Sequence, residues 1–169
     1  DEIEKAFGDS SDRDGGTMMR CTGALLSWLQ DNPNPNFIVA TSNSLRRMGE
    51  IGLTMSRSGR FDRMFFVDVP NRKSRGRMLR RWIGDAFPNA DTVADDLARR
   101  TERFSGADLF DVVKLARMHA EAAGVPLAEE HLSTQIERKR LRAQALYDEF
   151  QGLRQWGRIY CDPAGSTDD

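Results

Sequence analysis

The chain has 169 residues, of which 39% are hydrophobic and 30% are charged, and its formal net charge is -1. This composition is typical of a globular protein with room for one domain, or for one domain and a small helical appendage. No stretch is long and apolar enough for a transmembrane helix, and no basic segment leads into an apolar core as in a signal peptide. The two cysteines, Cys21 and Cys161, are far apart and have no metal-binding spacing. They favour a reducing compartment, and we expect a cytoplasmic protein.

The first 70 residues predict one helix and two buried strands. Residues 17–30 carry apolar side chains at helical spacing, and the prolines of the following segment end that helix. Residues 37–41, "FIVAT", are a compact apolar run that is typical of a strand buried on both faces. Residues 63–70, "RMFFVDVP", predict a second strand that Pro70 closes. Two parallel strands are too few for a stable sheet, so this region resembles part of a larger one.

After Pro70 the pattern becomes helical. Asn71 is a suitable N-cap for a first helix, and Asp91 for a second. Ser105 and Asp108 have the spacing of a capping box for a third helix, which ends near Gly124. A long fourth helix is predicted over roughly residues 127–157.

These elements predict an α/β fold with two parts and a tail. Residues 1–70 are predicted to contain part of a larger parallel sheet, and residues 71–160 a small all-α region. Residues 161–169, "CDPAGSTDD", are predicted to be a disordered tail.

Three stretches carry the chemical signal: residues 1–7 "DEIEKAF", residues 37–44 "FIVATSNS" and residues 56–70 "SRSGRFDRMFFVDVP". Each is a weak signal alone, because acidic pairs, polar strand ends and loop arginines are common. In this order and spacing they resemble the AAA family of ATPases, within the wider AAA+ group. The resemblance implies that residues 1–70 are the second half of a parallel-sheet nucleotide-binding subdomain of the P-loop type, and that residues 71–160 are its small all-α lid. The first stretch, "DEIEKAF", and the Trp-containing segment "RQWGRIY" are similar to segments of a group of functionally obscure AAA proteins in plastids and cyanobacteria.

The resemblance implies roles for the acidic pair and for the end of the first strand. Asp1 matches the Walker B aspartate that holds Mg²⁺, and Glu2 matches the glutamate that orients the attacking water. Asn43 matches the sensor 1 residue, which contacts the γ-phosphate and the water. A hard divalent cation prefers carboxylate oxygens and keeps several waters, so an Asp suits the metal role.

The resemblance also implies residues that reach the nucleotide from elsewhere. Arg57 and Arg60 match the arginine fingers, which act on the nucleotide of the neighbouring subunit. A guanidinium is planar and permanently cationic, which suits the charge that develops during phosphoryl transfer. Gly106 and Ala107, in "FSGADL", match the start of the lid helix that packs near the adenine.

The sequence contains no P-loop, because none of its glycines is followed by Lys. We therefore expect the chain to represent the C-terminal half of an AAA module, from the Walker B segment onward, and to be inactive alone. The family resemblance implies that the complete enzyme binds ATP and Mg²⁺, forms a homo-oligomeric ring and remodels protein substrates. An alternative is a non-catalytic module that docks on a complete AAA subunit and supplies arginine fingers in trans.

Three other features have more ordinary interpretations. The basic residues between positions 72 and 81 are expected to form a solvated helix face, with an acidic partner or a nucleic-acid backbone as alternatives. Nucleic acid is the weaker alternative because no aromatic residues are interleaved for base stacking. The loop over residues 8–16 could be a solvated loop or a substrate-gripping pore loop. His119 and His131 are expected to be structural or surface residues.

Overall fold

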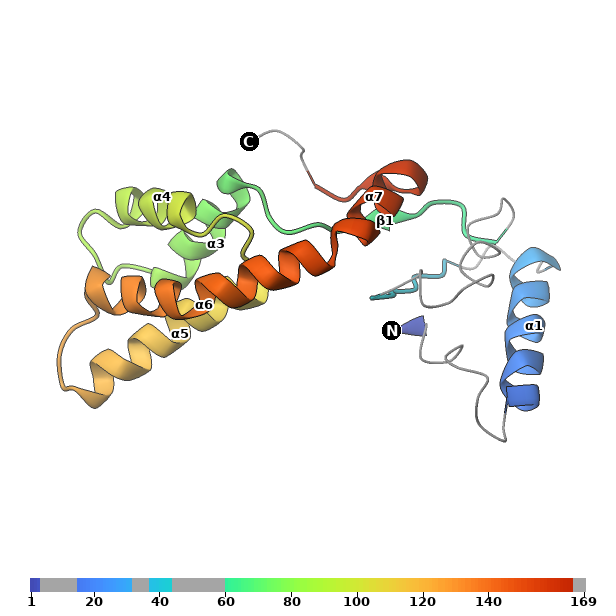
Figure 1. Cartoon of the computed structure of the whole chain (residues 1–169), viewed down its shortest axis with the longest axis horizontal. Coiled ribbons are helices and arrows are strands. Elements are labelled where there is room, and N and C mark those ends of the chain that lie inside the picture. The colour runs from blue at the N-terminus through green and yellow to red at the C-terminus, as the bar shows by residue number, and fades with distance from the viewer. Residues whose placement is uncertain (4–14, 32–36, 44–59, 166–169) are drawn as a thin grey trace. The chain divides into compact units, whose positions relative to one another are not determined.

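The computed structural model describes residues 1–3, 15–31, 37–43 and 60–165 (Figure 1). These residues are mostly helical and contain one small sheet of two parallel strands. The elements in chain order are α1 (Gly15–Asp31), β1 (Phe65–Phe66), α3 (Arg72–Ile83), α4 (Ala90–Arg100), α5 (Gly106–Ala122), α6 (Glu129–Glu149), α7 (Gln151–Tyr160) and β2 (Asp162–Pro163). Among the described helices, none combines the length and the hydropathy needed to cross a membrane.

The chain divides into two compact units. The N-terminal unit consists of Asp1–Phe65 and Trp156–Asp162, and the helical unit consists of Phe66–Gln155 with the segment from Pro163. Each unit is described by itself below.

The helical unit has a closed apolar core. In Figure 1, α5 and α6 run side by side, with α3 and α4 packed beside them. Every one of these four helices contributes fully buried side chains at helical spacing. The largest are Leu79, Ile83, Leu97, Leu109, Leu132, Ile136 and Val112, and Phe104 from the loop between α4 and α5 is buried with them. Each such side chain stabilises the fold by about 1.5–3 kcal/mol through its removal from water.

Helix caps explain where two of these helices begin. The Asn71 side chain accepts a hydrogen bond from the backbone N–H of Ser74 at 2.9 Å, which confirms the predicted cap of α3. Ser105 and Asp108 form the predicted capping box of α5, with each side chain accepting from the other residue's backbone N–H at 3.1 Å. The predicted Asp91 cap is wrong. Helix α4 begins at Ala90, and the Asp91 carboxylate instead accepts from Arg80 Nε at 2.9 Å.

Arginine side chains satisfy the carbonyl groups at two helix ends. Arg75, 7% exposed, donates to the carbonyl of Ala98 at the end of α4 and to that of Pro70. Arg117 on α5 donates to the carbonyls of Trp82 and Ile83 at the end of α3. The last carbonyls of a helix have no partner within the helix, so these contacts both cap the helices and join them.

The predicted helix over residues 127–157 is two helices. Helix α6 ends at Glu149 and α7 begins at Gln151, because Phe150 departs from helical geometry with φ -87° and ψ 8°. The guanidinium of Arg154 donates to the carbonyl of Tyr147 in the last turn of α6. Its side chain also stacks on the Tyr147 ring at 3.5 Å, so the break is fixed by specific contacts.

The two predicted strands of the first half are corrected by the structure. Residues 37–41 form no strand, and Phe37 and Val39 are 96% and 71% exposed rather than buried. Within residues 63–70 only Phe65–Phe66 is a strand. A strand needs a neighbour for its backbone hydrogen bonds, and the described residues offer the 37–41 segment only one such bond, from Ile3.

Strand β1 pairs instead with the segment predicted to be a disordered tail. The N–H of Asp162 donates to the carbonyl of Met64 at 2.9 Å, and that of Ala164 donates to Phe66 at 3.0 Å. Arg63 adds an ion pair to the Asp162 carboxylate at 2.8 Å. Residues 162 and 163 are therefore ordered as β2, because their backbone groups find partners in β1.

Candidate functional site

The hydroxyl of Thr41 joins the acidic pair to the end of the 37–41 segment. It accepts the backbone N–H of Glu2 at 3.0 Å and donates to Asp1 Oδ1. The carbonyl of Thr41 accepts the N–H of Ile3 at 2.9 Å. Three contacts to one residue therefore hold two stretches side by side that are about 40 positions apart in the sequence.

Asn43 completes this group of polar side chains. Its amide nitrogen Nδ2 donates to Glu2 Oε1 at 2.9 Å. This bond holds the Glu2 carboxylate in one orientation, next to the end of the 37–41 segment. Glu2 has a left-handed backbone, with φ 52°, which is uncommon for a residue other than glycine. The structure thus brings together three of the predicted site residues: Asp1, Glu2 and Asn43.

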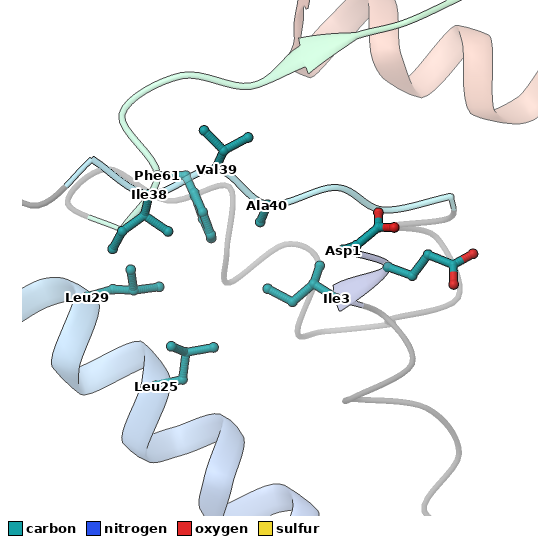
Figure 2. A pocket seen from close by; sticks show the side chains of 9 residues that line it. Asp1, Ile3, Leu25, Leu29, Ile38, Val39, Ala40 and Phe61 are labelled. Atoms are coloured by element: carbon teal, nitrogen blue, oxygen red, sulfur yellow. The ribbon is translucent and has the colours of Figure 1, made fainter.

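A cavity of about 600 Å³ lies next to these carboxylates in the N-terminal unit. Figure 2 shows Leu25 and Leu29 projecting from α1 towards Ile38 and Phe61, with Asp1 at the far end of the cavity. Most of the lining side chains are apolar, and the two carboxylates of Asp1 and Glu2 are the charged groups among them. The arrangement is an apolar surface with an acidic edge.

The Asp1 carboxylate fits Mg²⁺ only as one ligand of a site that other groups complete. The described residues contain no group of three or more His, Cys, Asp or Glu side chains that could hold a metal ion. Mg²⁺ is commonly bound through one or two carboxylates, several waters and the phosphates of a substrate. Asp1, with Oδ1 engaged by Thr41, matches that single-carboxylate role and would need a nucleotide to complete the coordination.

The predicted arginine fingers are described only in part. Arg57 lies outside the described residues. Arg60 lies in a turn of the N-terminal unit and is half-buried, and the next residue, Phe61, lines the cavity. Their proposed action on a neighbouring subunit stays a prediction.

Gly106 and Ala107 form the first turn of α5, as the sequence predicts. Gly106 is half-buried, and a Cβ atom at this position would lie 4.0 Å from the sulfur of Met78. Ala107 is exposed. Both residues belong to the helical unit, so their role at the adenine stays a prediction of the family resemblance.

Thr41 is the site residue that sequence reasoning missed. Its position two residues before Asn43, at the end of an apolar run, was the available signal. A β-branched residue suits a strand, but a hydroxyl can also bridge a carboxylate and a backbone N–H. In this structure the second property decides its role.

Comparison with known proteins gives matches to AAA domain-containing proteins, each over part of the relative's length. The chain is 35% identical over 122 residues to an uncharacterized AAA domain-containing protein, ycf46, of Pyropia yezoensis, which covers 70% of this chain and 24% of the relative. It is 37% identical over 112 residues to the ycf46 protein of Trieres chinensis, covering 64% of this chain and 22% of the relative. The chain belongs to the AAA family.

A more distant relative is described as the ATP-dependent zinc metalloprotease FTSH 9 of Oryza sativa subsp. japonica. It is 28% identical over 137 residues, which cover 81% of this AAA chain and 17% of the relative. The AAA chain spans about a quarter or less of the length of the curated relatives it matches. No family model and no solved structure matches it.

Proposed function

We propose that this chain supplies the metal-binding and water-orienting edge of an AAA ATPase module, in the second half of its nucleotide-binding subdomain, together with its helical lid. The complete module hydrolyses MgATP at subunit interfaces, in a homo-oligomeric ring that remodels protein substrates in the cytoplasm. The observation that supports this most is the hydrogen bond from Asn43 to Glu2, beside an Asp1 that Thr41 orients.

The geometry suits phosphoryl transfer to water. Such reactions depend on positioning and charge neutralisation more than on covalent chemistry by the protein. Glu2 would orient the attacking water and accept its proton, and Asn43 would hold the Glu2 carboxylate in place. Asp1 would be a protein ligand of Mg²⁺, and the ion would supply positive charge that offsets the charge of the phosphates.

Charge stabilisation would come from Arg57 and Arg60. An arginine finger supplied by a neighbour increases the rate of nucleotide hydrolysis by about a thousandfold or more. Gly106 and Ala107 would contact the adenine from the first turn of α5. Because this sequence contains no P-loop, the phosphate cradle would come from a further segment of the complete module.

The test is a chimera in which this chain replaces the matching segment of the rice FTSH 9 relative. We expect the chimera to hydrolyse ATP and Glu2→Gln to lower its turnover by about 100-fold or more, since a positioned general base contributes that much. Glu149→Gln, the same change at an exposed residue of α6, is the matched control and should leave turnover unchanged. A chimera without activity, or equal effects of the two variants, would contradict the proposal.

The arginine assignment has a separate readout in the same chimera. Arg57→Ala with Arg60→Ala should lower ATP turnover by about a thousandfold while nucleotide binding is kept. Restored turnover in mixtures with subunits that carry Glu2→Gln would show that the fingers act across the interface. Full activity of the arginine double variant would remove both residues from the mechanism.

A further inference from the structure

Helix α3 has a polar side that contacts α4. Arg72 Nη2 lies 2.9 Å from Asp95 Oδ1, and Arg80 Nε lies 2.9 Å from Asp91 Oδ1. Between them, a Cβ atom at Gly76 would lie 3.9 Å from the Cβ of Ala98. Two of the basic residues of α3 are therefore paired with the neighbouring helix.

Two further sides of α3 are occupied by other packing. Leu79 and Ile83 are fully buried in the core, and Arg75 is buried with them through its bonds to backbone carbonyls. On the next side Trp82 meets Phe110 of α5 edge to face, with ring centroids 5.5 Å apart. Because a helix has 3.6 residues per turn, one face of α3 lies outside all of these contacts with the other described residues.

That face carries three exposed cations at four-residue steps. Lys73, Arg77 and Arg81 are all exposed, and they lie about 40° apart around the helix and about 6 Å apart along it. We call them the α3 basic stripe. In the part of the chain that the structure describes, no carboxylate forms an ion pair with any of the three. The other basic residues of the helix, Arg72, Arg75 and Arg80, have partners.

We propose that the α3 basic stripe is a docking surface for an acidic α-helix of a partner protein. A helix with Glu or Asp at positions i, i+4 and i+8 has the same spacing of about 6 Å, so all three cations can pair at once. This surface belongs to the helical unit and does not depend on the acidic site of the N-terminal unit.

The surroundings of the stripe favour a protein helix over a nucleic acid. Asp85 and Asp91, with 98% and 91% of their side-chain surface exposed, flank it on the α4 side. A nucleic-acid backbone is negative along its whole length and would be repelled by these flanking carboxylates. An acidic stripe bordered by basic or neutral residues on a partner helix would complement both the cations and their flanks.

The experiment titrates the full chain with synthetic helical peptides and follows backbone amide shifts by NMR. One peptide of about 20 residues, long enough to be helical in an Ala-rich sequence, has three Glu residues at four-residue spacing. The comparison peptide has the same composition with its Glu residues on different faces. We expect the first to bind about tenfold more tightly, with shift changes centred on α3 and weakening as salt increases.

Two charge-reversal variants test whether peptide binding depends on the α3 basic stripe or only on the net charge of the chain. Arg77→Glu should weaken binding of the first peptide by about tenfold, since it replaces an attraction by a repulsion. Arg138→Glu makes the same change at an exposed residue of α6 and should leave the affinity unchanged. Both residues are exposed, so neither variant should change the thermal unfolding midpoint. Equal binding of the two peptides, equal effects of the two variants, or tighter binding of single-stranded DNA than of the first peptide would overturn the proposal.

Discussion

The two units of the chain differ in how far their apolar side chains are buried. In the helical unit Leu79, Leu109 and Ile136 are fully buried, whereas in the N-terminal unit Phe37 and Val39 are 96% and 71% exposed. Helices satisfy their backbone groups locally and then pack through one apolar face, so four of them suffice for a core. Strands depend on neighbours for both hydrogen bonds and burial, and the described residues do not provide them to the 37–41 segment.

The largest effect that this comparison predicts is on core leucines. Leu109→Ala should lower the free energy of unfolding by about 3–4 kcal/mol, because it leaves a cavity in a closed core. Leu29→Ala, in the cavity lining of the N-terminal unit, should cost below about 1.5 kcal/mol since Leu29 is already half-exposed. Urea unfolding followed by circular dichroism measures both. Leu141→Ala, at an 84% exposed position, is the surface control.

Similar losses for Leu109→Ala and Leu29→Ala would show that the two units do not differ as described. If Leu141→Ala lowered the free energy of unfolding as much as Leu109→Ala, burial in the core would not explain the effect at Leu109.

The next effect concerns two ion pairs of different burial. Arg154, whose side chain is 5% exposed, lies 2.7 Å from Asp68, whereas Arg63 and Asp162 pair at 2.8 Å with 65% and 51% of their side-chain surface exposed. Arg154→Met should lower the free energy of unfolding by about 2–3 kcal/mol because it leaves charged and carbonyl groups without their donor. Arg63→Met should cost less than about 1 kcal/mol, as exposed pairs do. Equal costs in urea unfolding would contradict the difference in burial.

A smaller effect is expected at the capping box. Ser105→Ala removes the acceptor for the Asp108 N–H and should cost about 1 kcal/mol. Ser133→Ala, inside α6, makes the same chemical change away from a cap and should be neutral or slightly stabilising. The thermal unfolding midpoints of the two variants measure the difference. A thermal unfolding midpoint for Ser105→Ala at or above the wild-type value would show that the Ser105 cap does not stabilise α5.

The smallest effect is a pH dependence. The hydrogen bond and charge of Lys139, at 2.8 Å, lower the pKa of Asp111 below its ordinary value. A lowered pKa in the folded state means that this pair contributes stability above the pKa of the unfolded carboxyl, and loses it as pH falls through the folded value. An NMR titration should place the Asp111 midpoint below that of an ordinary Asp, and Lys139→Met should raise it. A midpoint that does not move would contradict the role of Lys139.

Sequence patterns predicted the helical unit better than the N-terminal unit, for a physical reason. The caps at Asn71 and Ser105 depend on residues three positions apart, so a short window of sequence contains them. The break at Phe150 was not predictable, because it involves Arg154 and its distant partner Asp68. The exposure of residues 37–41 depends on which strands lie beside them, and the residues themselves carry no such information.

The candidate site was predictable in part. The motif order pointed to Asp1, Glu2 and Asn43, and the structure places them together. The bridging role of Thr41 was not predicted, because a threonine in an apolar run equally suits an ordinary strand. The α3 basic stripe also required the structure, since the sequence shows six basic residues between positions 72 and 81 but not which of them have partners.

A double-mutant cycle of Glu2 and Asn43 in the FTSH 9 chimera tests the central claim most directly. If the Asn43 amide acts by holding the Glu2 carboxylate, Asn43→Ala should slow ATP turnover clearly in the presence of Glu2 and hardly at all once Glu2→Gln is in place. Independent effects that multiply in the double variant would contradict the account, because the two side chains would then not act on the same water.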